Sequence, residues 1–194
     1  MEKEEQLKQV RKKRAFSKFI KWAIGVAVII VIGFLIIKTV GRQRENLPGL
    51  FQPEQSRIHI QPGQEHPPYS SNPPTSGWHY DAPAQTGIYD RELPDEQLIH
   101  NMEHQHVWIS YRPDLINRET VDKLAEITRR FGSKIIMAPR SKNDSAIALA
   151  AWEYLLKLDS FDEKVIIDFI QAHRGKTGPE NIPDRGFKDF RENL

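Results

Sequence analysis

Residues 107–138 read VWISYRPDLINRETVDKLAEITRRFGSKIIMA, and this stretch decides the fold. Its two ends, Val107–Tyr111 and Lys134–Ala138, are rich in β-branched, aromatic and apolar residues, which is typical of strands, and a proline stands within two residues of the end of each run. Between them apolar residues recur at helical spacing, and Asn117 and Gly132 suit the start and the end of a helix. The pattern predicts a β-α-β unit with two parallel strands joined by a right-handed crossover.

The flanking sequence completes the predicted domain. Two more helices are expected, one from Asn143 or Asp144 to about Leu158 and one opening at Ser160 or Asp162 and running through His173. Upstream, ten of the thirteen prolines lie between residues 48 and 113, so regular structure should be sparse there. The sequence therefore predicts an α/β fold, with α+β as the alternative: a small sheet with a β-α-β unit, C-terminal helices and a long proline-rich N-terminal loop.

An apolar segment precedes this domain. Residues 22–37 carry no charge, and with their neighbours they give a predicted transmembrane helix over residues 19–40 that contacts the lipid bilayer. Eight Lys or Arg against three Glu in residues 1–21 favour a cytoplasmic N-terminus under the positive-inside rule. A cleaved signal peptide is the alternative. We expect a single-pass cell-membrane protein whose C-terminal domain is extracytoplasmic.

Composition limits the classes of function that this chain can have. The net charge of +2 argues against a general nucleic-acid binder, so we expect no nucleic-acid partner. The chain contains no cysteine, so neither disulfides nor thiolate ligands are available. Any metal site must use His, carboxylate, Met or water.

The stretch LIHNMEHQHVWISY, residues 98–111, concentrates such donors. His100 and His104 are four apart and share a face on a helix or on a strand, so they can bind one metal. As His-x-x-Glu-His the same residues could instead form a hydrolase motif with Glu103 as general base, but a strand is expected only three residues after His104. The third interpretation is structural, with these imidazoles hydrogen-bonded at the end of a strand.

Five motifs give the chain a family resemblance: SNPPTSGWHY at 71–80, HNMEHQHVWISY at 100–111, APR at 138–140, IALAAW at 147–152 and FIQAHRGKTGPE at 169–180. Through these motifs the chain resembles the bacterial family of domain of unknown function 3105 over residues 66–180. The matching positions of interest are His79, His100, Glu103 and His104. Gln105 and His106 stand where that family usually has glycines.

The resemblance implies a third imidazole at the site. His79 lies in a proline-pinned loop that can fold back onto His100 and His104. Met102 as a soft fourth ligand would favour copper, whereas completion by water or a carboxylate would suit zinc. Glu103 is expected to orient a ligand imidazole rather than to bind the ion.

We therefore expect a membrane-anchored, extracytoplasmic metal-binding domain that uses a histidine cluster, with copper favoured over zinc. The alternatives are a metal-dependent hydrolase and a structural or partner-binding envelope domain without metal, so enzymatic activity stays open and binding is favoured. The expected organisation is a cytoplasmic basic segment (1–18), a transmembrane helix (19–40), a linker (41–65), a globular domain (66–180) and a polar tail (181–194).

Overall fold

The computed structural model describes residues 18, 20–22, 24–36, 38 and 47–191. The chain divides into two units, Met1–Asn46 and Leu47–Leu194. The second unit extends beyond the expected 66–180 range on both sides, because residues at 50–51 and at 188–189 belong to its main sheet.

In the first unit, residues 18, 20–22, 24–36 and 38 are helical. Within the part of the chain that the structure describes, no helix is long and apolar enough to cross a membrane. The predicted transmembrane helix at 19–40 is therefore not supported, and residues 19, 23, 37, 39 and 40 of that segment lie outside the described residues.

The second unit is built on a mixed sheet. Over residues 47–191 seven strands form it in the order β1-β8-β7-β5-β6-β4-β9, and β2 pairs with β3 in a separate two-stranded ladder. Three described helices, α2, α3 and α4, accompany these sheets. The bounds are β1 Leu50–Phe51, β2 His59–Ile60, β3 His79–Tyr80, β4 Gly87–Ile88, α2 Asp95–Glu103, β5 Val107–Tyr111, α3 Arg118–Phe131, β6 Ile135–Pro139, β7 Ile147–Ala151, β8 Tyr154–Leu158, α4 Glu163–His173 and β9 Lys188–Asp189.

The predicted β-α-β unit is confirmed. Strands β5 and β6 are adjacent and parallel, and α3 connects them. The side chain of Asn117 caps α3 by accepting a hydrogen bond from the Thr120 amide, and Gly132 ends the helix at φ 65°. The mixed α/β class is therefore confirmed, although the sheet is larger than expected.

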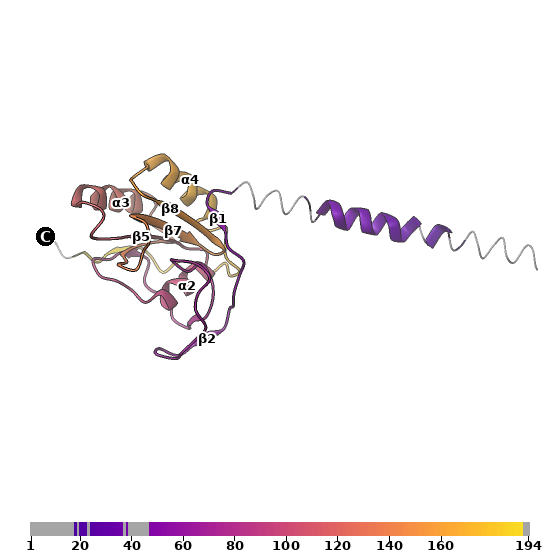
Figure 1. Cartoon of the computed structure of the whole chain (residues 1–194), viewed down its shortest axis with the longest axis horizontal. Helices are drawn as coiled ribbons and strands as arrows, with labels where there is room; N and C mark the ends of the chain where they lie inside the picture. Colours follow the sequence, from indigo (N-terminus) through magenta and orange to yellow (C-terminus); the bar gives the residue numbers. More distant parts are fainter. Residues whose placement is uncertain (1–17, 19, 23, 37, 39–46, 192–194) are drawn as a thin grey trace, which may run out of the picture. The chain divides into compact units, whose positions relative to one another are not determined.

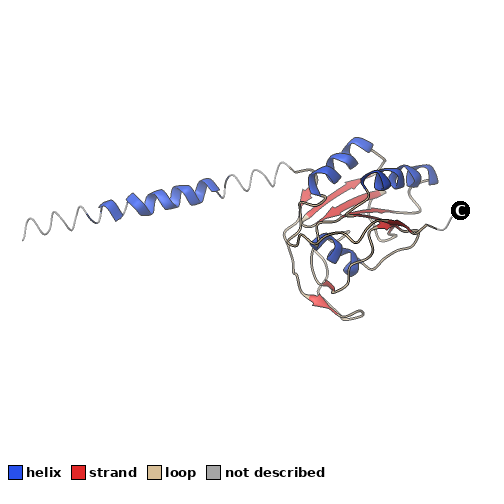
Figure 2. Cartoon of the chain, turned by 180° about the vertical axis from the view of Figure 1, so that it is seen from behind, coloured by secondary structure: helices blue, strands red, loops and turns tan. Residues whose placement is uncertain are grey.

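The central strands are buried on both faces, because helices cover both sides of the sheet. Helices α3 and α4 lie on one face and α2 on the other (Figures 1 and 2). Alternate residues of β7 pack on opposite faces of the sheet. Ile147 and Leu149 belong to the apolar cluster with α3 and α4, whereas Ala148 and Ala150 belong to the cluster with α2. This double burial explains why these strands are almost uniformly apolar.

The helix predicted from Asn143 or Asp144 to Leu158 is wrong. This segment forms the antiparallel hairpin β7–β8, with Glu153 at φ 64° in its turn. Apolar residues at positions 147, 150, 151, 154 and 155 fit a helical spacing, but the sheet buries all five residues of β7 between β5 and β8. Tertiary pairing thus overrides the helical preference of the alanines.

The last predicted helix is confirmed as α4, whose N-cap Asp162 accepts a hydrogen bond from the Val165 amide. Only one of the two expected C-terminal helices is therefore present among the described residues. The chain after α4 passes the C-terminal end of α2 and then adds β9 to the sheet beside β4.

Candidate metal centre

Helix α2 presents His100 and Glu103 on one face, since residues three apart are neighbours on a helix. Both are buried, at 5% and 3% exposure. The Nδ1 of His100 lies 2.6 Å from the carbonyl oxygen of Tyr80. A carbonyl only accepts, so Nδ1 carries the hydrogen and Nε2 keeps a free lone pair.

The short ladder β2–β3 supplies two further histidines. His59 and His79 are register partners in this parallel pair, and Ile60 and Tyr80 form the next pair. Side chains alternate along a strand, so both imidazoles lie on the same side of the ladder. Their ring centroids are 4.7 Å apart in an edge-to-face arrangement.

His79 is fully buried and bonded through both ring nitrogens. Its Nδ1 lies 2.7 Å from the carbonyl oxygen of Gly77, and its Nε2 lies 2.9 Å from Oε2 of Glu103. A carbonyl and a carboxylate both accept, so both nitrogens carry hydrogen and the ring is an imidazolium. A metal ion can replace the Nε2 proton without disturbing the bond from Nδ1 to Gly77.

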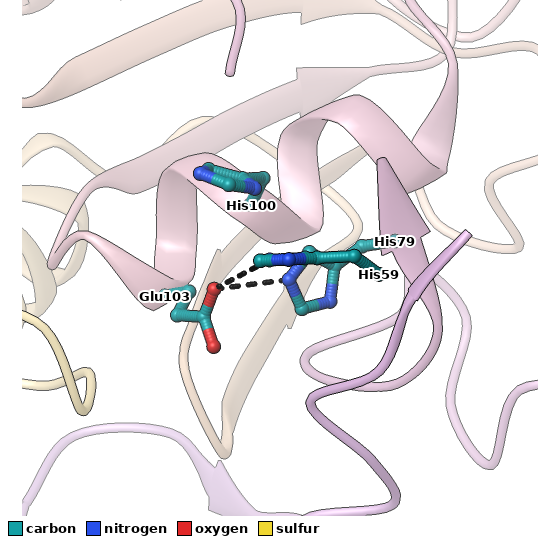
Figure 3. A group of neighbouring side chains, drawn as sticks. All are labelled: His59, His79, His100 and Glu103. Atoms are coloured by element: carbon teal, nitrogen blue, oxygen red, sulfur yellow. Dashed lines mark hydrogen bonds and ion pairs between the residues drawn. The ribbon is translucent and has the colours of Figure 1, made fainter. Parts of the chain in front are cut away.

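His59 repeats this orientation at the solvent side. Its Nδ1 is 3.4 Å from a carboxylate oxygen of Asp81, and its Nε2 is 3.6 Å from Oε2 of Glu103. The side chain is 44% exposed, so it forms the open edge of the group. Figure 3 shows the Glu103 carboxylate reaching both His59 and His79, with His100 above them on α2.

The four side chains can hold a metal ion together. One ligand atom from each of His59, His79, His100 and Glu103 lies within 4.8 Å of all the others. Ligands of a tetrahedral zinc ion are about 3.3–3.4 Å apart, given bonds of about 2.0–2.1 Å. Closing the group around an ion therefore requires side-chain shifts of at most about 1.5 Å.

The pKa values of three of these side chains are shifted by burial and by their neighbours. Burial raises the pKa of Glu103, but the hydrogen bond from His79 and the neighbouring imidazoles outweigh it and lower that pKa. Burial lowers the pKa of His100, as does nearby His104. Burial also lowers the pKa of His79, but its hydrogen bonds to Glu103 and Gly77 outweigh this effect and raise it. These shifts favour an ionised Glu103 and an uncharged His100, the forms that can bind a cation, and a metal ion bound at Nε2 of His79 would have to displace a proton there.

The structure brings together only part of the predicted ligand set. His79 and His100 meet, and Glu103, predicted to support a ligand, lies among the potential ligands themselves. His104 caps the C-terminal end of α2, and its Nε2 lies 3.3 Å from Oε2 of Glu180. Met102 is fully buried with apolar side chains of the α2 cluster, because a helix turns a residue two positions from His100 to its other side.

Sequence reasoning missed His59 as a potential ligand, and it did not count His106 among the ligands. No local motif marks His59 in the sequence, because it reaches the site only through the pairing of β2 with β3, where it stands opposite His79. His106 is buried against Thr86, with Nε2 3.0 Å from the hydroxyl, and burial lowers its pKa to about 4. It belongs to neither potential metal-binding group among the described residues.

Comparison with known proteins gives a family but no activity. The family described as protein of unknown function (DUF3105) matches residues 59–186, about two thirds of the chain. The chain therefore belongs to this family, and the resemblance seen in the sequence is confirmed. The match begins at His59 and includes all four residues of the group. No curated protein and no solved structure matches the chain.

Proposed function

We propose that this domain binds a divalent transition-metal ion through His59, His79, His100 and Glu103. The observation that supports this most strongly is the orientation of the imidazoles. Each Nδ1 faces an oxygen acceptor outside the group, at Asp81, Gly77 and Tyr80 respectively. The Nε2 atoms of His59 and His79 instead face Glu103 within the group, where an ion could take the place of the proton on His79. Metal-bound histidines almost always have such a partner on the second nitrogen.

The donor set favours zinc, with copper(II) as the second candidate. Three imidazoles and a carboxylate complete a tetrahedral zinc site. The same nitrogens accept copper(II), which generally binds more tightly than zinc. The thioether that would have favoured copper(I), that of Met102, lies in the apolar cluster with Leu98 and Ile99.

Metal content of the purified full-length chain tests this function. We expect zinc or copper to remain after dialysis of the wild type and to be lost in the double variant His79→Ala/His100→Ala. His66→Ala is the matched control, because His66 belongs to neither potential metal group among the described residues. A metal at a hundred times its dissociation constant should stabilise the wild type by about 2.7 kcal/mol. The proposal would be contradicted if the purified wild type contained no metal and its melting temperature did not change on addition of zinc or copper. That result would favour a structural or partner-binding domain.

Binding is better supported than hydrolysis. A general base must face a water or substrate proton, whereas Oε2 of Glu103 lies 2.9 Å from Nε2 of His79 and counts among the ligand atoms. The His-x-x-Glu-His spacing at residues 100–104 is therefore better explained by a donor set in which Glu103 is itself a ligand. Peptide and ester substrates should remain intact with the metal-loaded chain.

We also propose that the domain acts outside the cytosol, next to a bilayer that residues 19–40 contact. The support is in the sequence: an uncharged run at 22–37 and an excess of cations before it. A reporter fused after Leu194 should be active only outside the cytosol. Activity of the same fusion inside the cytosol would overturn this location.

A further inference from the structure

The segment that follows α4, residues 175–186, passes over the C-terminal end of α2; we call it the C-terminal strap. Its backbone is tied to that end, because Gly175 donates to the Gln105 carbonyl at 2.9 Å and Glu180 donates to the Glu103 carbonyl at 3.0 Å. The second bond occupies a carbonyl group that the end of a helix leaves unpaired, because Glu103 is the last residue of α2. The strap thereby places the Glu180 side chain beside α2.

Glu180 completes a second group of potential ligands. One ligand atom from each of Glu103, His104 and Glu180 lies within 4.8 Å of the others. His104 is mostly buried and Glu180 is half exposed, at 13% and 48% of their side-chain surfaces. The Nε2 of His104 lies 3.3 Å from Oε2 of Glu180, so the imidazole and the carboxylate already face each other.

The two groups adjoin and share Glu103. The rings of His100 and His104 are only 4.4 Å apart between centroids. His59, His100, His104 and Glu180 all line one cavity of about 450 Å³, so both groups are open to water and ions from the same side. A carboxylate has two oxygens with lone pairs for more than one partner. Two-metal centres hold their ions about 3.5–4 Å apart, a separation that one carboxylate can bridge.

We propose that Glu103 bridges two metal positions, the first completed by His59, His79 and His100 and the second by His104 and Glu180. This inference rests on the proposed function, since the second position shares a ligand with the first. Water from the cavity fills the remaining coordination of the second ion. That ion has fewer protein ligands and a half-exposed one, so it binds more weakly, and its binding fastens the C-terminal strap to α2.

Zinc titration of the full-length chain, stripped with a chelator, tests this proposal. We expect two ions per wild-type chain in two steps of different affinity. His104→Ala and Glu180→Gln should each retain the tight step and lose the weak one, and the control His66→Ala should keep both. The Gln variant preserves the backbone bond to Glu103, so it separates loss of a ligand from loss of the strap.

The outcomes distinguish the two proposals. One ion in the wild type and in both variants overturns the second position and leaves the proposed function intact. No ion in the wild type defeats the proposed function itself. Two ions in both variants show that His104 and Glu180 are not ligands and also overturn the second position.

Copper(II) provides an independent readout of the bridge. Two copper ions joined by one carboxylate couple magnetically, so the second equivalent should weaken or split the electron paramagnetic resonance signal of the first. Glu180→Gln should give only the signal of an isolated ion. Two independent, additive signals in the wild type would overturn the bridging role of Glu103.

Discussion

His59 and His79 stand opposite each other in the parallel ladder β2–β3, and both turn an Nε2 nitrogen toward the same oxygen of Glu103, at 3.6 Å and 2.9 Å. The ladder therefore sets the spacing of two imidazoles, while α2 sets that of His100 and Glu103. The centre forms only where these separate pieces of backbone meet.

Replacing His59 by alanine should weaken zinc binding at the tight position at least about tenfold, or about 1.4 kcal/mol. The reason is that water has to replace one of four protein ligands. Competition with a chromophoric chelator measures the change. Since His59 is 44% exposed, folding should be nearly unaffected, and circular dichroism of the metal-free variant checks this. An unchanged affinity would remove His59 from the ligand set.

Glu103→Gln should destabilise the metal-free chain by about 3 kcal/mol, the lower end of the cost of breaking a buried ion pair. The imidazolium of His79 loses its partner while fully buried, but it can release its proton, which limits the penalty. Urea unfolding at neutral pH measures the difference. The control Glu65→Gln changes an exposed carboxylate and should stay within about 0.5 kcal/mol of the wild type. Equal stability of both variants would show that the pair contributes little.

His173 should make stability depend on pH. It is fully buried between Tyr154 and Phe169, with Nε2 2.8 Å from the Pro48 carbonyl oxygen, and burial lowers its pKa. Between this lowered native pKa and the unfolded value of about 6.5, the unfolded chain binds more protons, so the free energy of unfolding falls as pH falls through that window.

The variant His173→Gln isolates this effect, since an amide can still donate to Pro48 but does not titrate. Urea unfolding at a series of pH values should show the wild type losing stability relative to the variant as pH drops below about 6.5. Above that pH the difference between the two should be constant. A pH-independent difference throughout would exclude His173 as the titrating group.

Gly178→Ala should remove the second zinc equivalent and leave the first. Gly178 has φ +131°, and an added Cβ would lie 2.6 Å from the Met102 carbonyl oxygen, so the strap has to move away from α2. Gly186→Ala is the matched control, because it has φ +98° with nothing within 4 Å of the added carbon. Calorimetric zinc titration compares the two. Loss of the second step in both variants would point to backbone strain rather than to the position of Glu180.

The sequence predicts the parts of this fold that rest on local signals. Asn117 and Gly132 mark the two ends of α3, and the apolar runs around them become β5 and β6 as expected. Around Ala150 the local signal misleads, because an alanine-rich run fits a helix as well as a doubly buried strand. The pairing of β7 with β5 and β8 decides between these conformations, and β5 lies far earlier in the chain, beyond the reach of a local signal.

The candidate site also combines residues that local sequence brings together with residues that only the fold brings together. His100 and Glu103 are close in sequence and come together on α2, whereas His59 reaches them only through the pairing of β2 with β3. Glu180 lies in the C-terminal strap, whose residues on either side of it form neither helix nor strand. Sequence spacing carries no signal for such distant contacts. It also predicted Met102 as a ligand because Met102 lies between the histidines in the sequence, whereas its side chain is buried in the apolar core.

The ladder β2–β3 has a kinetic consequence. Two pairs of residues make a strand pairing far too short to be stable alone, whereas α2 is packed against the sheet by buried Leu98, Ile99 and Met102. Helix α2 thus holds His100 and Glu103, and His79 is fully buried beside them, whereas the half-exposed His59 stands on the short strand β2 at the open edge of the group. Detachment of β2 would carry His59 away and expose the ion to solvent or to an acceptor. For an ion bound at the proposed site, we expect the lifetime to depend on how often this ladder opens, so side chains that strengthen or weaken the ladder should change the rate of metal release far more than the geometry of the filled site.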